Sequence, residues 1–407
     1  MSNNEQKPPI RFNGFTEPWE QRKLGDMGTT FSGLSGKTKE DFGHGDAKFV
    51  TYMNVFSNPI SDPSRTESVE IDTSQNAVQY GDVFFTTSSE TPEEVGMSSI
   101  WLENSENTYL NSFCFGYRPT VKIDPQYMAY MLRSDTVREK IIYLAQGISR
   151  YNISKNGVMQ IEVPLPSLHE QKLLGEYFRN LDNLITLHQR KYDKLLKIKK
   201  SMLEKMFPRN GSNVPEIRFA GFTDPWEQRK LGDTFEFLQN NTLSRAELTA
   251  ESGVAKNVHY GDVLIKFGEY LDTSNSTLPY IPSQQTVDKF KGSLLQDGDV
   301  IMADTAEDET VGKCTEIAEL QGFPTISGLH TIPMRPKQKF ASGYLGYYMN
   351  SGSYHDQLLP LMQGIKVTSV SKSAIFNTDI SYPVDSDEQA KIGNFFIHLD
   401  QLITLHQ

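Results

Sequence analysis

The chain has 407 residues, which is enough for two domains of ordinary size that each bury a core of their own. Its formal net charge of −11 excludes a uniformly basic nucleic-acid coat, and no apolar run approaches the roughly 18 residues of a membrane span. The first residues lack the apolar stretch of a signal peptide, and the two cysteines form no metal-binding or disulfide pattern, so we expect a cytoplasmic protein without a membrane partner.

Two segments of the chain occur twice. Residues 10–26 and 217–233 are identical at 15 of 17 positions, at an offset of 207 residues. Residues 175–189 resemble residues 393–407 at an offset of 218. A period above about 200 residues indicates domain duplication rather than a solenoid. Because the sequence between the repeats differs much more, we expect a repeated frame that carries two variable inserts.

The first insert, residues 27–167, begins with strand-like runs at 48–56 and 82–87. Two short helices are expected next. Their end residues are Asp124 and Pro125 at the start of the first helix, and Ser134 and Gly147 at the two ends of the second.

The second insert, residues 234–385, follows the same plan at an offset of 217. The matching elements are Gly81-Asp-Val with Gly298-Asp-Val, Gln146-Gly-Ile with Gln363-Gly-Ile, and Ser154-Lys with Ser371-Lys. The two inserts should therefore share a fold while presenting different surfaces.

Each insert ends in a long-helix signal. Ser167 and Glu170 form a predicted capping box, which Asp385 and Glu388 repeat. A helix over residues 168–206 would be roughly 58 Å long and would act as a strut. Apolar residues step along it by three and four positions, which predicts a coiled-coil seam. The seam residues are Leu174, Phe178, Leu181, Ile185, Tyr192, Leu195 and Met202.

Residues 190–209 carry eight Lys or Arg side chains and two acidic ones. This run is either a solvated helix face or a strip that faces phosphates or a partner. No counterpart of residues 190–207 follows the second helix repeat, so the distal helix is expected to be truncated.

The chain should therefore divide into five parts. They are the first repeated segment with its insert (10–167), the spacer helix (168–208), a linker (209–216), the second repeated segment with its insert (217–385) and the distal helix (386–407).

Catalytic motifs are incomplete or missing. The residues before Gly36-Lys-Thr38 lack the first glycine of a P-loop, and the acidic stretch 297–309 has no metal-ligand spacing. Base readout instead needs Arg, Lys, Asn, Gln, Ser or Thr on an exposed element. The loops 148–155 and 365–372 have that chemistry, although a polar loop that leads into a strand explains any single residue equally well. The candidates are Ser149, Arg150, Asn152, Lys155, Lys366, Thr368, Ser369 and Lys372, with Thr86 and Ser88 as weaker ones.

The repeated PWEQRKLGD, the Gly-Asp-Val elements, and AQGISRYNIS followed by PLPSLHEQ resemble the specificity (S) subunit of type I restriction–modification systems. The resemblance implies an α+β protein with two related mixed α/β target recognition domains, joined by long helices that form an antiparallel coiled coil. Each domain would read one half of a split site in double-stranded DNA. Two methyltransferase subunits and restriction subunits would be the partners, and they would hold S-adenosylmethionine, ATP and Mg²⁺, so that this chain is non-catalytic and binds no cofactor or metal.

Two other hypotheses stay open on the sequence alone. One is a scaffold whose inserts grip protein rather than DNA. The other is a silent or truncated specificity cassette that does not assemble.

Overall fold

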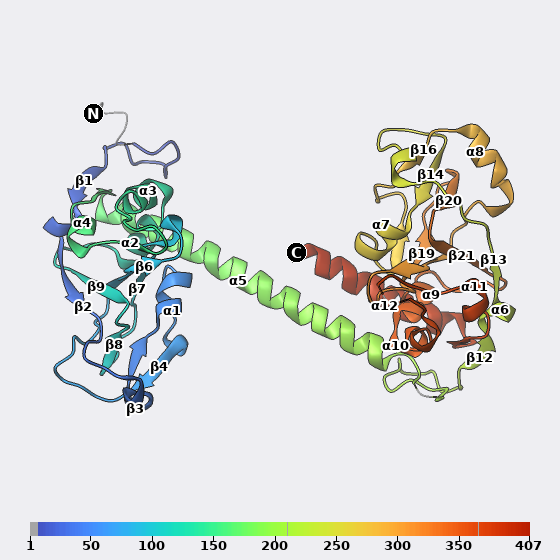
Figure 1. Cartoon of the computed structure of the whole chain (residues 1–407), viewed down its shortest axis with the longest axis horizontal. Helices are drawn as coiled ribbons and strands as arrows, with labels where there is room; N and C mark the ends of the chain where they lie inside the picture. The colour runs from blue at the N-terminus through green and yellow to red at the C-terminus, as the bar shows by residue number, and fades with distance from the viewer. Residues whose placement is uncertain (1–6, 210, 365) are drawn as a thin grey trace. The chain divides into compact units, whose positions relative to one another are not determined.

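The computed structural model describes residues 7–209, 211–364 and 366–407. The chain divides into two compact units, Met1–Thr186 and Leu187–Gln407, which we call unit 1 and unit 2 (Figure 1). Each unit combines short helices with small sheets, so the predicted α+β class with two related domains is confirmed. The predicted linker, 209–216, contains residue 210, which lies outside the described residues.

Unit 1 contains a four-stranded antiparallel sheet with the strand order β2-β9-β5-β7 and a three-stranded sheet with the order β4-β3-β8. The strands are β2 (Gly28–Ser32), β3 (Phe42–Val50), β4 (Thr66–Val69), β5 (Val83–Thr86), β7 (Ser98–Ile100), β8 (Thr108–Leu110) and β9 (Cys114–Pro119). The helices of its insert are α1 (Tyr52–Ser57), α2 (Pro125–Met131), α3 (Asp135–Tyr143) and α4 (Lys155–Met159). The rings of Phe85 and Phe115 stack in the main core, at 5.1 Å between centroids.

Unit 2 repeats this plan with a five-stranded sheet, β13-β21-β17-β19-β15, and a three-stranded sheet, β16-β14-β20. The strands are β13 (Phe235–Phe237), β14 (Ala255–Val258), β15 (Tyr270–Asp272), β16 (Tyr280–Ile281), β17 (Val300–Ala303), β19 (Cys314–Ala318), β20 (Thr325–Ser327) and β21 (Thr331–Pro336). The helices before its C-terminal helix are α6 (Leu231–Thr234), α7 (Tyr260–Ile265), α8 (Gln284–Lys289), α9 (Tyr344–Asn350), α10 (Gly352–His355) and α11 (Lys372–Ile375).

The repeated Gly-Asp-Val elements have a structural reason. Asp82 lies directly before β5, and its carboxylate is buried. The Arg118 guanidinium binds its two oxygens at 2.8 and 2.7 Å. Asp299 and Arg335 form the same pair in unit 2 at 2.9 and 2.7 Å. Burying a carboxylate is costly unless it is paired and hydrogen-bonded. Each pair therefore fixes two neighbouring strands of its sheet.

The repeated N-terminal segments are joined to the ends of the inserts. Strand β1 (Glu20–Lys23) pairs antiparallel with β11 (Glu162–Leu165), and β12 (Glu227–Lys230) pairs in the same way with β23 (Asp379–Tyr382). The strand before each insert therefore pairs with the strand that ends it, just before a long helix begins.

Both predicted capping boxes are half right. The Ser167 hydroxyl accepts the backbone N–H of Glu170 at 3.3 Å, as a cap should. The Glu170 carboxylate, however, is taken by the Arg11 guanidinium at 2.6 and 2.8 Å instead of returning to the cap. Arg218 holds Glu388 in the same way at 2.7 and 2.8 Å. The glutamates thus join the repeated N-terminal segments to the long helices, because a guanidinium binds a carboxylate through two charge-assisted hydrogen bonds.

Two helices follow these caps: α5 (Leu168–Lys205), which has residues in both units, and α12 (Ser386–Leu405). Within unit 2, the C-terminal part of α5 packs against α12. His188 meets His406, Lys199 meets Asp400, and the rings of Phe207 and Phe396 stack at 5.9 Å. Because higher numbers on α5 face lower numbers on α12, the two helices run antiparallel.

Three local predictions need correction. Residues 48–56 do not form one strand, because the Thr51 hydroxyl accepts the N–H of Asn54 and starts helix α1. Ser134 stands at the predicted cap of α3, but its hydroxyl donates to the Met131 carbonyl instead of capping. Helix α3 ends at Tyr143, before Gly147. The strand at Val83–Thr86 and the Asp124 cap of α2 are confirmed.

Candidate nucleic-acid interface

In each unit the structure joins the two stretches that carry candidate reading residues. Strand β6 (Ser88–Ser89) pairs antiparallel with β10 (Tyr151–Asn152), and Ser88 lies opposite Asn152. In unit 2, β18 (Thr305–Ala306) pairs with β22 (Thr368–Ser369), and Thr305 lies opposite Ser369. We call these two-stranded pairs the ladder of unit 1 and the ladder of unit 2.

The loops that lead into the ladders have the same turn. Gly147 and Gly364 have φ angles of 148° and 119°, which residues with a side chain rarely adopt. A Cβ atom at either position would lie 2.0 Å from a carbonyl oxygen, that of Arg150 in unit 1 and that of Val367 in unit 2. Glycine is therefore required for the turn. It brings residues 148–150 and 366–367 outward in equivalent positions, while residue 365 lies outside the described residues.

The tips of these loops are open to solvent. Ser149, Arg150 and Asn152 are exposed in unit 1, as are Lys366 and Ser369 in unit 2, whereas Thr368 and Ser88 are half-buried. These side chains offer guanidinium, ammonium, amide and hydroxyl groups, which form hydrogen bonds with base edges and phosphates. Within each unit, these side chains lie on the ladder or on the loop that leads into it.

Three of the predicted candidates are buried or hydrogen-bonded within their own unit. Thr86 is fully buried in β5, so its hydroxyl is not open to a nucleic acid. The Lys155 ammonium donates to the Ser32 hydroxyl at 2.8 Å, and the equivalent Lys372 donates to the Leu238 carbonyl at 3.0 Å. Burial lowers the pKa of Lys372. Lys155 thus ties the first turn of α4 to the end of β2, and Lys372 ties the first turn of α11 to the residue after β13.

The structure adds two aromatic positions that the sequence had not singled out. Tyr52 and Tyr260 begin α1 and α7, each directly after the residue that caps the helix. The Tyr52 hydroxyl donates to the Ser88 carbonyl at 2.8 Å, next to the ladder of unit 1. Burial raises the pKa of Tyr52. The ring of Tyr260 packs against His330 at 5.3 Å in an edge-on arrangement.

A second pair of equivalent residues lies beside each ladder. The N–H of Thr87 donates to the Phe113 carbonyl at 3.0 Å, and the N–H of Asp304 donates to the His330 carbonyl at 3.1 Å. Both pairs are related by the offset of 217. Recognising that Phe113 and His330 both come directly before a buried strand, β9 or β21, would have been the available sequence signal.

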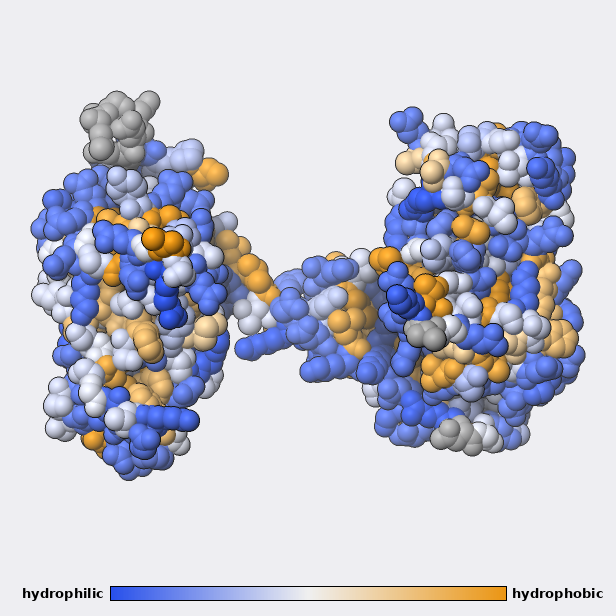
Figure 2. All heavy atoms as spheres, in the orientation of Figure 1, coloured by the Kyte–Doolittle hydropathy of each residue, from blue (hydrophilic) through white to orange (hydrophobic). Residues whose placement is uncertain are grey.

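The predicted seam on α5 has two different environments. In unit 2, Leu195 and Met202 pack against the main core together with α12, while Tyr192 is half-buried. In unit 1, Leu174 packs against the core, Leu181 is half-buried, and Phe178 and Ile185 are 43% and 67% exposed. Apolar side chains are thus open along α5 (Figure 2). The two helices of unit 2 realise the antiparallel pairing, but residues 177–185 keep an uncovered apolar face.

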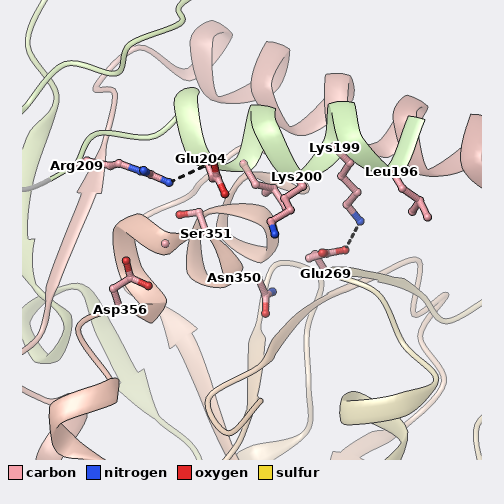
Figure 3. Close-up of a pocket in the computed structure, with 11 residues that line it drawn as sticks. Leu196, Lys199, Lys200, Glu204, Arg209, Glu269, Asn350, Ser351 and Asp356 are labelled. Carbon is pink, nitrogen blue, oxygen red and sulfur yellow. Dashed lines mark hydrogen bonds and ion pairs between the residues drawn. The ribbon is translucent and has the colours of Figure 1, made fainter. Parts of the chain in front are cut away.

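A polar hollow lies beside α5 in unit 2. Lys199 forms an ion pair of 2.7 Å with Glu269 (Figure 3). It forms a second ion pair of 2.7 Å with Asp400. Arg209 faces Glu204 at 3.8 Å. The two ion pairs of Lys199 attach α5 to the insert and to α12.

In the part of the chain that the structure describes, no helix has the length and apolar character needed to cross a membrane.

Residues 16–197 and 223–407 match the family model of the type I restriction modification DNA specificity domain. The chain is 22% identical to the type I restriction enzyme MjaVIII specificity subunit of Methanocaldococcus jannaschii over 294 residues, which are 70% of this chain and 65% of that protein. It is 34% identical to the StySPI specificity subunit of Salmonella potsdam over 104 residues, 26% of this chain and 22% of that one. The chain spans about half to two thirds of the length of its Methanocaldococcus relatives.

Among solved structures, a chain from work on the assembly and conformational transition of the type I R-M system is similar in fold. It has a TM-score of 0.50 at 16% identity, and the match covers 98% of this chain and 93% of that one. An S subunit from M. genitalium gives a TM-score of 0.49 at 13% identity, over 97% and 92% of the two chains.

Proposed function

Because the chain belongs to the type I restriction modification DNA specificity family, we propose that it is the DNA sequence-specificity subunit of a type I restriction–modification complex. Each unit reads one half of a bipartite site in double-stranded DNA. The observation that carries this proposal is the pair of equivalent ladders. Both stand on the same frame, both begin at a glycine turn, and they present different side chains: Asn152 and Ser88 in one unit, Ser369 and Thr305 in the other.

The chemistry of the loop tips fits this task. Arg150 in unit 1 and Lys366 in unit 2 are exposed beside polar side chains that both donate and accept hydrogen bonds. Cationic side chains bind phosphates without regard to sequence and can also bind the edge of a guanine, while amides and hydroxyls distinguish other base edges. A net charge of −11 limits the phosphate affinity that the whole chain can supply. We therefore assign selectivity to this chain and much of the phosphate affinity to its partners.

The partners in this proposal are two methyltransferase subunits and the restriction subunits. They supply S-adenosylmethionine, ATP and Mg²⁺ and perform the chemistry, so this chain acts without catalysis or a bound cofactor. The uncovered apolar face on α5, formed by Tyr177, Phe178, Leu184 and Ile185, supports a docking role for the helix. An apolar patch open on one helix face is typical of a surface that binds another protein.

Single-molecule methylome sequencing tests the proposal in a host that produces this chain with its methyltransferase subunit. The expected result is one methylated motif made of two short half-sites with a fixed spacer, absent when the chain is omitted. Purified complex should bind that duplex with an affinity that falls steeply as salt rises. Binding of a protein ligand with no preference for any duplex would instead support the scaffold hypothesis.

A further inference from the structure

We propose that positions 113 and 330 determine the base preference at one position in each half-site. Phe113 would contact the methyl group of a thymine, and the Nε2 atom of His330 would accept a hydrogen bond from the amino group of an adenine or cytosine. This inference rests on the proposed function and deepens it, because it assigns a specificity residue of known chemistry to each unit.

The two positions are equivalent in the fold. Phe113 immediately precedes β9, and His330 immediately precedes β21. Strand β9 pairs with β5, and β21 pairs with β17; β5 and β17 are the strands that begin in the two Gly-Asp-Val elements. Their carbonyls accept the N–H groups of Thr87 and Asp304, the residues just before β6 and β18. Each residue is therefore held by its backbone beside a ladder, at the same place in both units.

Both side chains face solvent although they adjoin buried strands. Phe113 is 62% exposed, whereas its successor Cys114 is buried. A phenylalanine that is 62% exposed gains only part of the free energy that full burial of its ring would provide, so most of its apolar surface is open to a ligand. Apolar contact with the thymine methyl group is the base-specific contact that a phenylalanine can make in the major groove.

His330 is held in a defined orientation. Its Nδ1 atom lies 3.3 Å from the Asp304 carboxylate, which also accepts the Thr305 hydroxyl at 2.7 Å. The ring packs on Tyr260, and the residue has a φ of 53°, in the left-handed region that few residues other than glycine adopt. A carboxylate at Nδ1 favours the tautomer whose proton is on that atom. In the neutral imidazole, Nε2 is then a hydrogen-bond acceptor.

The two positions carry side chains of different chemistry, as readers of two half-sites with different sequences would. Position 113 offers an apolar surface and position 330 offers an acceptor, on the same backbone frame. The adenine N6 and cytosine N4 amino groups are the donors that an acceptor can find in the major groove, and the thymine methyl group is the apolar one.

The test compares four variants of the chain by the methylome measurement, each produced together with the methyltransferase subunit. Phe113→Ala and His330→Ala remove the proposed contacts. Phe113→Leu keeps an apolar side chain, and His330→Gln keeps an acceptor. Both substituted positions are exposed, and a circular-dichroism melt of each purified complex checks the fold.

We expect Phe113→Ala to relax a thymine position in one half-site and His330→Ala to relax an adenine or cytosine position in the other, each by about tenfold in discrimination. Phe113→Leu and His330→Gln should retain most of it. Should an alanine variant abolish methylation altogether, recovery in its conservative partner supports the assignment and continued loss overturns it.

Two negative outcomes are distinguishable. A wild-type complex that methylates no bipartite motif overturns the proposed function, and this inference with it. A wild-type complex with a clear bipartite motif, whose base frequencies are the same in both alanine variants, overturns only the assignment of Phe113 and His330.

Discussion

The Nδ1 atoms of His188 and His406 lie 3.0 Å apart, and the two residues are separated in sequence by 218 positions. That separation equals the offset between the two copies of the helix segment. Equivalent residues of the two repeats therefore contact each other across the antiparallel pair of α5 and α12. Duplication supplied a self-complementary contact, in which one imidazole donates to its own counterpart.

This contact should respond to pH. Burial, followed by the nearby charges of Lys191 and His188, lowers the pKa of His406 below its ordinary 6.5. Because the folded state binds the proton less readily than the unfolded state, the contact is stable above pH 6.5 and weakens as the pH falls below it. The protection factors of the amides in the last turn of α12, corrected for the intrinsic pH dependence of amide exchange, should be lower at pH 5.5 than at pH 7.5. His406→Gln is the control, and an unchanged pH response in that variant would contradict the explanation.

The ion pair between Arg218 and Glu388 should contribute to the stability of unit 2. The Glu388 carboxylate is buried and accepts both guanidinium hydrogen bonds, so Glu388→Ala should lower the free energy of unfolding by about 1.5–3 kcal/mol. Urea unfolding measures the change. Asp387→Asn, one position away at an exposed site, should have little effect. Equal losses in both variants would mean that helix charge, not the ion pair, is responsible.

Lys199 should contribute to the stability of unit 2 by attaching α5 to the insert and to α12. It is the cation between Glu269 and Asp400, and Lys199→Met would leave two carboxylates facing each other without it. We expect a loss of about 3 kcal/mol in the free energy of unfolding at pH 7. Lys200→Met is the matched control on the next residue of the same helix. A denaturation midpoint unchanged by Lys199→Met would sink this account of the hollow.

Equivalent leucines of the two helix repeats should behave differently. Leu399 is buried in the main core of unit 2, so Leu399→Asp should prevent that unit from folding, because it buries an unpaired charge. Leu181, at the equivalent position in unit 1, is half-buried. Leu181→Asp should leave unit 1 folded and reduce co-purification of the methyltransferase subunit. The opposite pattern, an unfolded Leu181→Asp variant, would show that this face is core rather than docking surface.

Arg150 should affect one half-site only. Arg150→Ala is expected to weaken recognition of that half-site by about 1–3 kcal/mol if the guanidinium binds a base in bidentate fashion, and to leave assembly intact. Methylome sequencing of the variant gives the discrimination at each base. Lys366→Ala is the corresponding change in unit 2. Identical methylation of both half-sites in Arg150→Ala would refute the role of Arg150.

The sequence by itself determined the repeat, the class of fold, the long helices and the family, because these depend on local patterns and on near-identity between distant segments. It also named candidates for DNA reading in residues 148–155 and at Thr86 and Ser88, but as two separate stretches of the chain. That Asn152 lies opposite Ser88 was decided by strand pairing across more than 60 residues of sequence.

Tertiary structure decided which side chains are free. Thr86 and Ser88 are two residues apart and chemically alike, yet Thr86 is buried and Ser88 is half-buried beside the ladder. Phe178 and Phe396 occupy equivalent places in the helix repeat, but Phe178 is 43% exposed and Phe396 is 0% exposed. Exposure depends on what packs against a residue from elsewhere in the chain, and Phe207 covers Phe396. A sequence repeat specifies the residue at each position, while the fold specifies its neighbours.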